Sequence, residues 1–143
     1  MGAVSVYLDV NVIIPLFAVD LLSDRAEKAL RNLDDDLVVS DFCAAEFSSV
    51  IARRVRTRDL RAEEARTAFS NFDSWCARYT RRLEIDTIDV SGASGLMRRL
   101  DLSLRTPDAL HLAMVHRTNC KLLTFDRSMA SAAQGLGIEI VSG

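Results

Sequence analysis

Proline and glycine are scarce in this sequence, with two prolines and six glycines among 143 residues. This scarcity excludes a collagen-like chain and a chain built mainly of linkers. Long apolar runs are also missing: the longest, at residues 12–19, is far shorter than the roughly 20 residues that cross a bilayer. We therefore expect no membrane-spanning segment. We also expect no signal peptide, because no basic flank precedes an apolar stretch.

Cysteine, lysine and histidine are equally sparse, with three, two and two residues respectively. The cysteines, Cys43, Cys76 and Cys120, are odd in number and share no close spacing. Such a set favours reduced thiols in the core over a disulfide framework or a zinc site. Reduced thiols and the expected lack of a signal peptide together predict a cytoplasmic protein.

The composition that remains is typical of a folded domain, because 49% of the residues are hydrophobic and 27% are charged. The length suits one domain, so we expect a single domain over residues 1–143. The net charge of −2 excludes a globally basic nucleic-acid binder. The charge is unevenly spread, however, because residues 47–82 contain nine arginines against four acidic residues. A local basic face therefore remains open to an anionic partner.

Short apolar runs alternate with longer amphipathic stretches along the chain. The runs predict strands at residues 4–9, 37–39, 83–88, 121–125 and 138–141. The stretches between them predict helices at residues 11–33, 40–56, 60–82, 92–101, 106–119 and 127–135. Because the strands lack polar alternation, we predict a parallel sheet with helices on both faces, a three-layer α/β/α fold of the Rossmann-like kind.

Local signals mark some of the helix ends. The first helical stretch is expected to break near Pro15 and Asp20. Ser40 is expected to cap the second helix. Thr106 is expected to cap the helix whose first residue is Pro107.

Four acidic residues stand where a parallel sheet can gather them. Asp9 closes the first strand and Asp126 the fourth, and ligands of such sheets lie outside the carboxyl ends of the strands. Asp108 lies in the first turn of its helix, and Glu46 lies among apolar neighbours on the inward stripe of another helix. A carboxylate on an inward stripe must be paired, bound to a metal or neutralised.

Each acid also has an ordinary structural interpretation when it is taken alone. Asp9 and Asp126 are acceptable turn residues. Asp108 suits the positive end of a helix dipole, and Glu46 can pair with an arginine in the core. Four acids at one edge, with no lysine or histidine that accompanies all of them, would repel one another. A divalent cation removes that cost, and ligation by oxygen alone selects Mg²⁺ or Mn²⁺ over zinc.

Four segments carry a resemblance to a known family. They are Tyr-Leu-Asp-Val-Asn at residues 7–11, Ser-Asp-Phe-Cys-Ala-Ala-Glu at residues 40–46, Thr-Pro-Asp-Ala-Leu-His-Leu-Ala at residues 106–113 and Leu-Thr-Phe-Asp at residues 123–126. In this order and over this length, they resemble the four motifs of the PIN domain. More narrowly, they resemble those of VapC toxins from bacterial toxin–antitoxin pairs.

The resemblance implies a Mg²⁺- or Mn²⁺-dependent endoribonuclease that cleaves RNA, is bound by a cognate antitoxin and forms a homodimer. The acidic site that it implies consists of Asp9, Glu46, Asp108 and Asp126. Asn11 and Thr124 match the family's supporting polar positions, which help to hold ligands or water.

Phosphodiester hydrolysis needs acidic residues of this kind, whichever family the protein belongs to. The reaction requires an activated water and neutralisation of charge in the transition state, and one or two metal ions supply both. Asp9 and Asp126 are the expected primary ligands, because strand ends hold them rigidly. Asp108 is expected to bind a second metal or to orient water. Glu46, from a helix across the cleft, is the weakest expected ligand and acts through water.

Three further features have competing interpretations. His111 follows Asp108 by one helical step, so the two can form a metal pair, although a histidine among leucines is more typical of a packed, hydrogen-bonded residue. The arginine-rich stretch at residues 53–66 can contact an RNA backbone, end a solvated helix or dock an antitoxin. Phe72 and Trp75 favour a core or dimer contact over a base-stacking platform.

Other functions compete with RNA cleavage. A haloacid-dehalogenase-like phosphatase or a receiver domain also places an aspartate after the first strand. The phosphatase needs a second aspartate where Asn11 stands, and its lysine is missing because Lys121 begins a strand on the wrong edge. A non-catalytic binding module of the same fold is the other alternative, and four intact acids argue against it. Dinucleotide binding fails because no GxGxxG follows the first strand.

Overall fold

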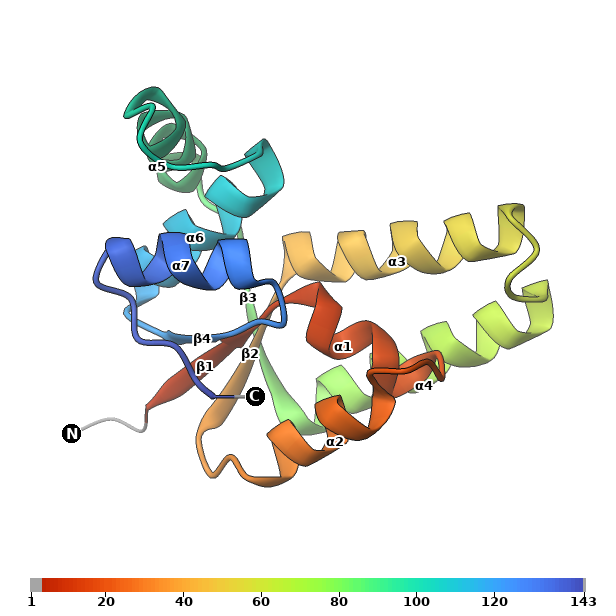
Figure 1. Cartoon of the computed structure of the whole chain (residues 1–143). Helices are drawn as coiled ribbons and strands as arrows, with labels where there is room; N and C mark the ends of the chain where they lie inside the picture. The colour runs from red at the N-terminus through yellow and green to blue at the C-terminus, as the bar shows by residue number, and fades with distance from the viewer. Residues whose placement is uncertain (1–3, 143) are drawn as a thin grey trace.

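The structure, a computed structural model, describes residues 4–142. Its strands are β1 (Ser5–Leu8), β2 (Asp36–Ser40), β3 (Thr80–Leu83) and β4 (Lys121–Leu123). Its helices are α1 (Val10–Phe17), α2 (Ser23–Arg31), α3 (Asp41–Arg56), α4 (Ala62–Tyr79), α5 (Thr87–Arg98), α6 (Thr106–Thr118) and α7 (Arg127–Gly135). Figure 1 shows the sheet at the centre of these elements.

The four strands form one parallel sheet in the order β3-β2-β1-β4. β1 is central because it is apolar on both faces: Val6 and Leu8 pack into one half of the core and Tyr7 into the other. Helices α1 to α4 cover the Val6 side, and α6 and α7 cover the Tyr7 side. The predicted three-layer α/β/α fold with a parallel sheet is therefore confirmed.

The strand order creates a switch point between β1 and β4. From β1 the chain winds outward to β2 and β3, and it then returns to place β4 on the other side of β1. Ligands of open α/β sheets bind outside the carboxyl ends of the strands at such a point. Helices α1 and α7 begin there, directly after β1 and shortly after β4, and α3 begins at the same edge of the sheet after the neighbouring β2. Asp9 and Asp126, which cap α1 and α7, therefore lie at the switch point.

Helices α3 and α4 form a long hairpin that extends away from the sheet (Figure 1). A cluster of aromatic rings joins this hairpin to α1. Phe47 and Phe72 stack with their ring centroids 4.1 Å apart, and Phe17 packs edge-on against both of them and against Trp75. Phe72 and Trp75 thus contribute to the core, which is one of the two roles expected of them.

The third strand differs most from the predicted elements. The prediction of a strand at residues 83–88 is wrong, because β3 spans Thr80–Leu83 and α5 already begins at Thr87. β3 lies at the edge of the sheet and exposes Arg81 and Arg82, so it lacks the apolar run by which buried strands are recognised. The helices predicted at residues 60–82 and 92–101 end and begin earlier as a result.

Helix α1 and helix α6 differ from the prediction at single residues. α1 contains Pro15, so the break expected there is wrong, and the chain instead breaks between Phe17 and Ser23, near Asp20 as expected. Ser40 caps α3 as expected, by accepting a hydrogen bond from the Cys43 N–H at 2.9 Å. Arg105, and not Thr106, is the N-cap of α6.

The predicted last strand is reduced to one contact. Residues 138–141 form no strand, and a single parallel bridge joins Leu122 of β4 to Ile140. The three cysteines are buried free thiols, as predicted. Within residues 4–142, no helix combines the length and the apolar character needed to cross a membrane.

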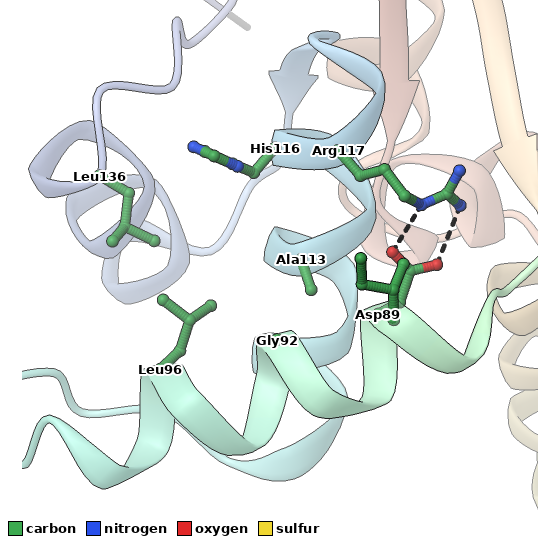
Figure 2. A pocket seen from close by; sticks show the side chains of 8 residues that line it. Asp89, Gly92, Leu96, Ala113, His116, Arg117 and Leu136 are labelled. Atoms are coloured by element: carbon green, nitrogen blue, oxygen red, sulfur yellow. Dashed lines mark hydrogen bonds and ion pairs between the residues drawn. The ribbon is translucent and has the colours of Figure 1, made fainter.

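A cavity of about 350 Å³ lies between α5, α6 and the end of α7 (Figure 2). Its lining is largely apolar, and Leu96 and Leu136 face each other across it. At one end, Asp89 of α5 forms an ion pair with Arg117 of α6, with 2.7 Å between Oδ1 and Nε. None of the predicted site acids lines this cavity, so we regard it as a packing feature beneath α5.

Candidate active site at the switch point

Asp9 follows β1 at the switch point and caps the N-terminus of α1. Its backbone N–H donates to the Leu123 carbonyl oxygen at 3.0 Å, which extends the pairing of β1 with β4 by one residue. Its Oδ1 accepts from the Val10 N–H at 2.7 Å, and its Oδ2 accepts from the Thr124 hydroxyl at 2.7 Å. The residue is only 6% exposed, so this carboxylate is buried with hydrogen bonds from neutral donors.

Burial raises the pKa of Asp9 above its ordinary value. His111 and the hydrogen bonds from Thr124 and Val10 act in the opposite direction, and the charge of Glu46 adds to the rise. The net increase means that the fold does not fully compensate the carboxylate for its removal from water. A buried carboxylate with a raised pKa at the carboxyl ends of the strands is a candidate for function.

Thr124 connects Asp9 to the turn that carries Asp126. While its hydroxyl donates to Asp9, the same oxygen accepts from the Asp126 N–H at 3.0 Å and from the Asn11 side-chain amide at 3.3 Å. Asn11 Oδ1 accepts in turn from the Phe125 N–H at 3.0 Å. Asn11 and Thr124 therefore tie the ends of β1 and β4 together, and their predicted contact with ligand or water stays a prediction.

Glu46 has a histidine as its partner and not an arginine. Its Oε1 lies 2.5 Å from Nε2 of His111, and the two side chains are 25% and 2% exposed. His111 belongs to α6 and Glu46 to α3, which cover opposite faces of the sheet. The contact therefore joins the two outer layers of the fold across the carboxyl edge.

His111 is also held at its second ring nitrogen. Nδ1 lies 2.5 Å from the Tyr7 hydroxyl, which lies 2.7 Å from the Ser40 hydroxyl. Tyr7 and Ser40 have no exposed surface, and burial raises the pKa of Tyr7 well above its ordinary value. Both ring nitrogens of His111 are thus engaged, which favours the packed, hydrogen-bonded interpretation over a metal pair with Asp108.

The role of Tyr7 and Ser40 was not predicted from the sequence. A signal was present, because Tyr7 is the one polar ring in a strand that is buried on both faces. A buried hydroxyl must find a partner, but the sequence alone does not show which residue supplies it.

Asp126 is the N-cap of α7, and Asp108 lies in the first turn of α6, where its side chain accepts a hydrogen bond from the backbone of the N-cap residue. Asp126 Oδ1 accepts from the backbone N–H groups of Ser128 and Met129 at 2.9 and 3.2 Å. Asp108 Oδ2 accepts from the Arg105 N–H at 3.2 Å and lies 3.9 Å from the Arg105 Nε. Each of these carboxylates uses one oxygen for its cap, so its second oxygen accepts no hydrogen bond from residues 4–142.

The four predicted acids are not gathered into one closed cluster. Asp9 interacts electrostatically with Glu46 and is joined to Asp126 through Thr124, but within the described residues no contact joins Asp108 to the others. Between residues 4 and 142, no three Asp, Glu, His or Cys side chains lie near enough to hold one ion. The donor chemistry nevertheless fits Mg²⁺ or Mn²⁺, because within the described residues Glu46, Asp108 and Asp126 each retain a carboxylate oxygen without a hydrogen bond.

A cation lies close to the turn between β4 and α7. The guanidinium carbon of Arg25, on α2, is 4.1 Å from the centroid of the Phe125 ring. Such a distance is typical of a cation–π contact. Arg25 was not predicted as a site residue, because nothing in its local sequence distinguishes it from other surface arginines.

The arginine-rich stretch at residues 53–66 lies at the far end of the α3–α4 hairpin (Figure 1). Two of its arginines form ion pairs: Arg54 lies 3.6 Å from Asp20, and Arg61 lies 3.2 Å from Glu64. The other arginines of the stretch are exposed. The exposure leaves a basic tip that is separate from the acids at the switch point.

Comparison with known proteins identifies the family. The sequence profile of the PIN domain matches residues 6–135. This match covers most of the chain, so the chain belongs to the PIN domain family. No curated protein sequence matches the chain.

Solved structures share the fold. FitAcB from Neisseria gonorrhoeae superposes with a TM-score of 0.76 and 16% identity over 96% of both chains. VapC20 from Mycobacterium tuberculosis, a toxin that cleaves the sarcin-ricin loop, gives 0.73 and 16% over 89% of this chain and 94% of its own. A toxin–antitoxin complex from Klebsiella pneumoniae gives 0.57 and 21% over 85% of this chain and 86% of the other. At such identities the similarity concerns the fold.

Proposed function

We propose that this PIN-domain protein is a Mg²⁺- or Mn²⁺-dependent endoribonuclease and the toxin of a toxin–antitoxin pair. The observation that carries the proposal is the buried Asp9 at the switch point, with Glu46 near it and its charge only partly compensated. A buried acid in this situation is costly unless it binds a positive partner. The description of VapC20 as a toxin that cleaves the sarcin-ricin loop supports the choice of reaction.

Asp9 and Asp126 are the residues that we propose to hold the ion, because β1 and β4 end beside each other and Thr124 joins the two. When bound, a divalent ion lowers the pKa of a water molecule and neutralises charge on the phosphate. Asp108 would hold a second ion or orient water through its unengaged Oδ1. Glu46 would orient water through its unengaged Oε2.

Asn11 and Thr124 have a supporting role in this proposal. Their hydrogen bonds fix the backbone of the turn at Phe125 and Asp126 against the start of α1. The positions of Asp9 and Asp126 relative to each other depend on those bonds. Loss of either polar side chain would therefore loosen the site without removing a carboxylate.

The proposed partners follow from charge and from the structural neighbours. RNA is the substrate, and the exposed arginines of residues 53–66 are proposed to contact its phosphates. A cognate antitoxin is the proposed protein partner, because one neighbour is described as a toxin–antitoxin complex. A homodimer is proposed on the family resemblance alone.

The competing functions receive less support from the site. For a haloacid-dehalogenase-like phosphatase, Asn11 stands where an acid is needed and its amide and carbonyl groups are engaged with Thr124 and Phe125. Lys121 begins β4, at the edge opposite the switch point, and forms ion pairs with Asp35 and Glu139. A non-catalytic binding module would gain nothing from a buried, partly compensated Asp9.

Incubation of the purified protein with total RNA tests the proposal. We expect cleavage in Mg²⁺ or Mn²⁺ and none in excess chelator, with cut ends that map to defined positions. Asp126→Asn should abolish cleavage and keep the fold, because asparagine caps helices as well as aspartate does. The matched control is Asp34→Asn, an exposed acid before β2, which should cleave like wild type. Equal cleavage with and without chelator would contradict metal dependence.

A further inference from the structure

We propose that His111 is a positioning residue that fixes the carboxylate of Glu46 through a buried chain of hydrogen bonds running from Ser40 through Tyr7. The inference rests on the proposed function, because it assigns a part in the reaction to a residue that touches neither RNA nor metal. It goes beyond that function, because it adds three residues that the four-acid site does not contain.

The chain of hydrogen bonds runs from strands β2 and β1 to helices α6 and α3. The Ser40 and Tyr7 hydroxyl oxygens are 2.7 Å apart, Tyr7 Oη is 2.5 Å from His111 Nδ1, and His111 Nε2 is 2.5 Å from Glu46 Oε1. Ser40 ends β2, Tyr7 lies in β1 and His111 lies in α6. Exposure falls to zero at Ser40 and Tyr7 and is 2% at His111. Only the Glu46 end reaches solvent.

The donors and acceptors fix the direction of the chain. An ionised Glu46 can only accept, so His111 donates from Nε2–H. Among the described residues the Ser40 hydroxyl has only the Tyr7 oxygen as an acceptor, so we assign Ser40 as the donor to Tyr7 and His111 Nδ1 as the acceptor from Tyr7. The Ser40 oxygen also accepts from the Cys43 N–H at 2.9 Å. Every hydroxyl and ring nitrogen in the chain is satisfied in this arrangement, and all the hydrogen bonds point toward Glu46.

Aromatic packing holds the plane of the His111 ring. Tyr7 contacts the ring edge-on at a centroid distance of 5.6 Å, and Phe42 lies at 5.1 Å with a tilt of 58°. A ring that is hydrogen-bonded at both nitrogens and packed against two aromatic residues has one orientation. The Nε2–H group therefore presents a fixed donor to α3.

Glu46 needs such a donor because its own side chain is flexible. It lies within α3 and is a quarter exposed, so without a partner its torsions would sample several rotamers. The hydrogen bond to Oε1 orients Oε2, the oxygen that we propose for water at the site. The charge of Glu46 also raises the pKa of Asp9, which indicates that Glu46 lies close to that acid.

A histidine that only fills the core would make a different contribution. Its replacement would lower stability and leave the catalytic step of the folded protein unchanged. The two roles are separable, because a glutamine side chain can place an amide N–H near the position of Nε2, whereas methionine fills similar space and cannot donate.

The test compares His111→Gln, His111→Met and Tyr7→Phe with wild type. We expect His111→Met to lower kcat for RNA cleavage about 10- to 100-fold with KM unchanged, because the loss falls on the catalytic step. His111→Gln should recover most of the loss. Tyr7→Phe, which keeps the ring and removes the hydroxyl, should give an intermediate kcat. Thermal unfolding of each variant gives the folded fraction for normalisation.

A second readout does not depend on RNA cleavage. In wild type, ¹H–¹⁵N NMR of the imidazole should show a proton on Nε2 of His111 and none on Nδ1, and Tyr7→Phe should alter the Nδ1 signal. Mn²⁺ affinity should weaken in His111→Met and recover in His111→Gln. If wild type cleaves no RNA, the ribonuclease proposal fails, while the Mn²⁺ and NMR results still decide the role of His111. A proton on Nδ1, or methionine and glutamine variants that behave alike, would overturn the inference.

Discussion

Asp9 and Asp89 are both buried aspartates, 6% and 1% exposed, and the fold treats them in opposite ways. Asp89 lies between α5 and α6 and accepts two hydrogen bonds from the Arg117 guanidinium, at 2.7 and 2.9 Å. Its Oδ2 also accepts from the Asp86 N–H at 2.8 Å. Asp9, at the switch point, accepts from the Thr124 hydroxyl and from the N–H of the next residue.

The pKa values of the two carboxyl groups move apart for that reason. Burial acts to raise the pKa of Asp89, but the hydrogen bonds and charge of Arg117, with the Asp86 N–H, outweigh it and leave the pKa below its ordinary value. For Asp9, burial dominates and the pKa is raised. A buried acid that serves only the fold receives its countercharge from the fold. An acid without one is available for a positive partner from outside the chain.

The largest expected effect is on the rate of RNA cleavage, in which Asp9 and Asp89 should differ. Asp9→Asn should lower RNA cleavage by about 1,000-fold, a loss typical of a group that stabilises charge in a transition state. The substitution is nearly isosteric, so the fold should persist. Asp89→Asn removes a carboxylate that is also covered by protein, and its cleavage rate per folded molecule should equal that of wild type. Single-turnover cleavage of one RNA substrate measures both.

The comparison fails if the two asparagine variants lose activity to the same extent. That result would mean that both carboxylates act through the stability of the fold. Urea unfolding of each variant must accompany the rates, so that a loss of folded protein is not mistaken for a loss of chemistry.

The next largest effect concerns stability, and here the loss is expected at Asp89 and not at Asp9. Arg117→Met should lower the free energy of unfolding by about 2 to 3 kcal/mol, because it leaves Asp89 buried without its countercharge. The value is below that for a fully buried pair, since the Arg117 side chain is 33% exposed. The control is Arg99→Met, which breaks the exposed pair with Asp101 and should leave stability unchanged. Equal losses in the two variants would contradict the assignment.

These two aspartates also show what the sequence can predict. Asp9 and Asp126 were found because each ends an apolar strand, and Asp108 and Glu46 because of their positions on helices. The order of the four motifs then joined the four acids into one expected site. Asp89 was not found, because its partner lies 28 positions away on another helix and no local pattern records such a pairing. Residue types at element ends are local information, whereas ion pairs between helices are set by packing.

The dependence on packing between distant elements also explains the other differences between the predicted and the observed structure. β3 was misplaced because an edge strand needs no apolar run, so Arg81 and Arg82 could occupy it. His111 was expected to be packed and hydrogen-bonded, which is confirmed, but its two partners come from β1 and α3. The four acids were expected together at one edge, which stays a prediction. Asp108 and Asp126 each use one carboxylate oxygen at the N-terminus of their own helix, a local role that the sequence could indicate.

A smaller effect is expected from metal. At ten times its dissociation constant, Mn²⁺ should stabilise the folded protein by about 1.4 kcal/mol, which raises Tm by about 5 °C for a chain of this size. Asp9→Asn should abolish the increase, and Asp89→Asn should keep it. Differential scanning calorimetry in Mn²⁺ and in chelator measures the shift. A Tm that does not respond to Mn²⁺ in wild type would count against the metal site.

The smallest expected effect is a difference in pH dependence, measured in chelator. The pKa of Asp9 is raised in the folded protein. Below about pH 4, the ordinary pKa of an aspartate, its carboxyl group is protonated in both the folded and the unfolded protein. As the pH rises from there through the pKa of the folded state, ionisation of Asp9 lowers the stability. Asp9→Asn should therefore match wild type in strong acid and exceed it at neutral pH. Because the pKa of folded Asp89 is lowered, its contribution is fully present above about pH 4 and is lost as the pH falls through the folded pKa.

Asp89→Asn should accordingly be less stable than wild type at neutral pH, and the gap should close in acid. Urea unfolding of wild type and both variants from pH 3 to pH 7 measures these differences. Both substitutions remove one negative charge, so a general effect of net charge moves the two curves in the same direction. The two curves move apart only if the fold supplies a countercharge to Asp89 and none to Asp9. Parallel curves would show that Asp9 carries no uncompensated charge for a metal to neutralise.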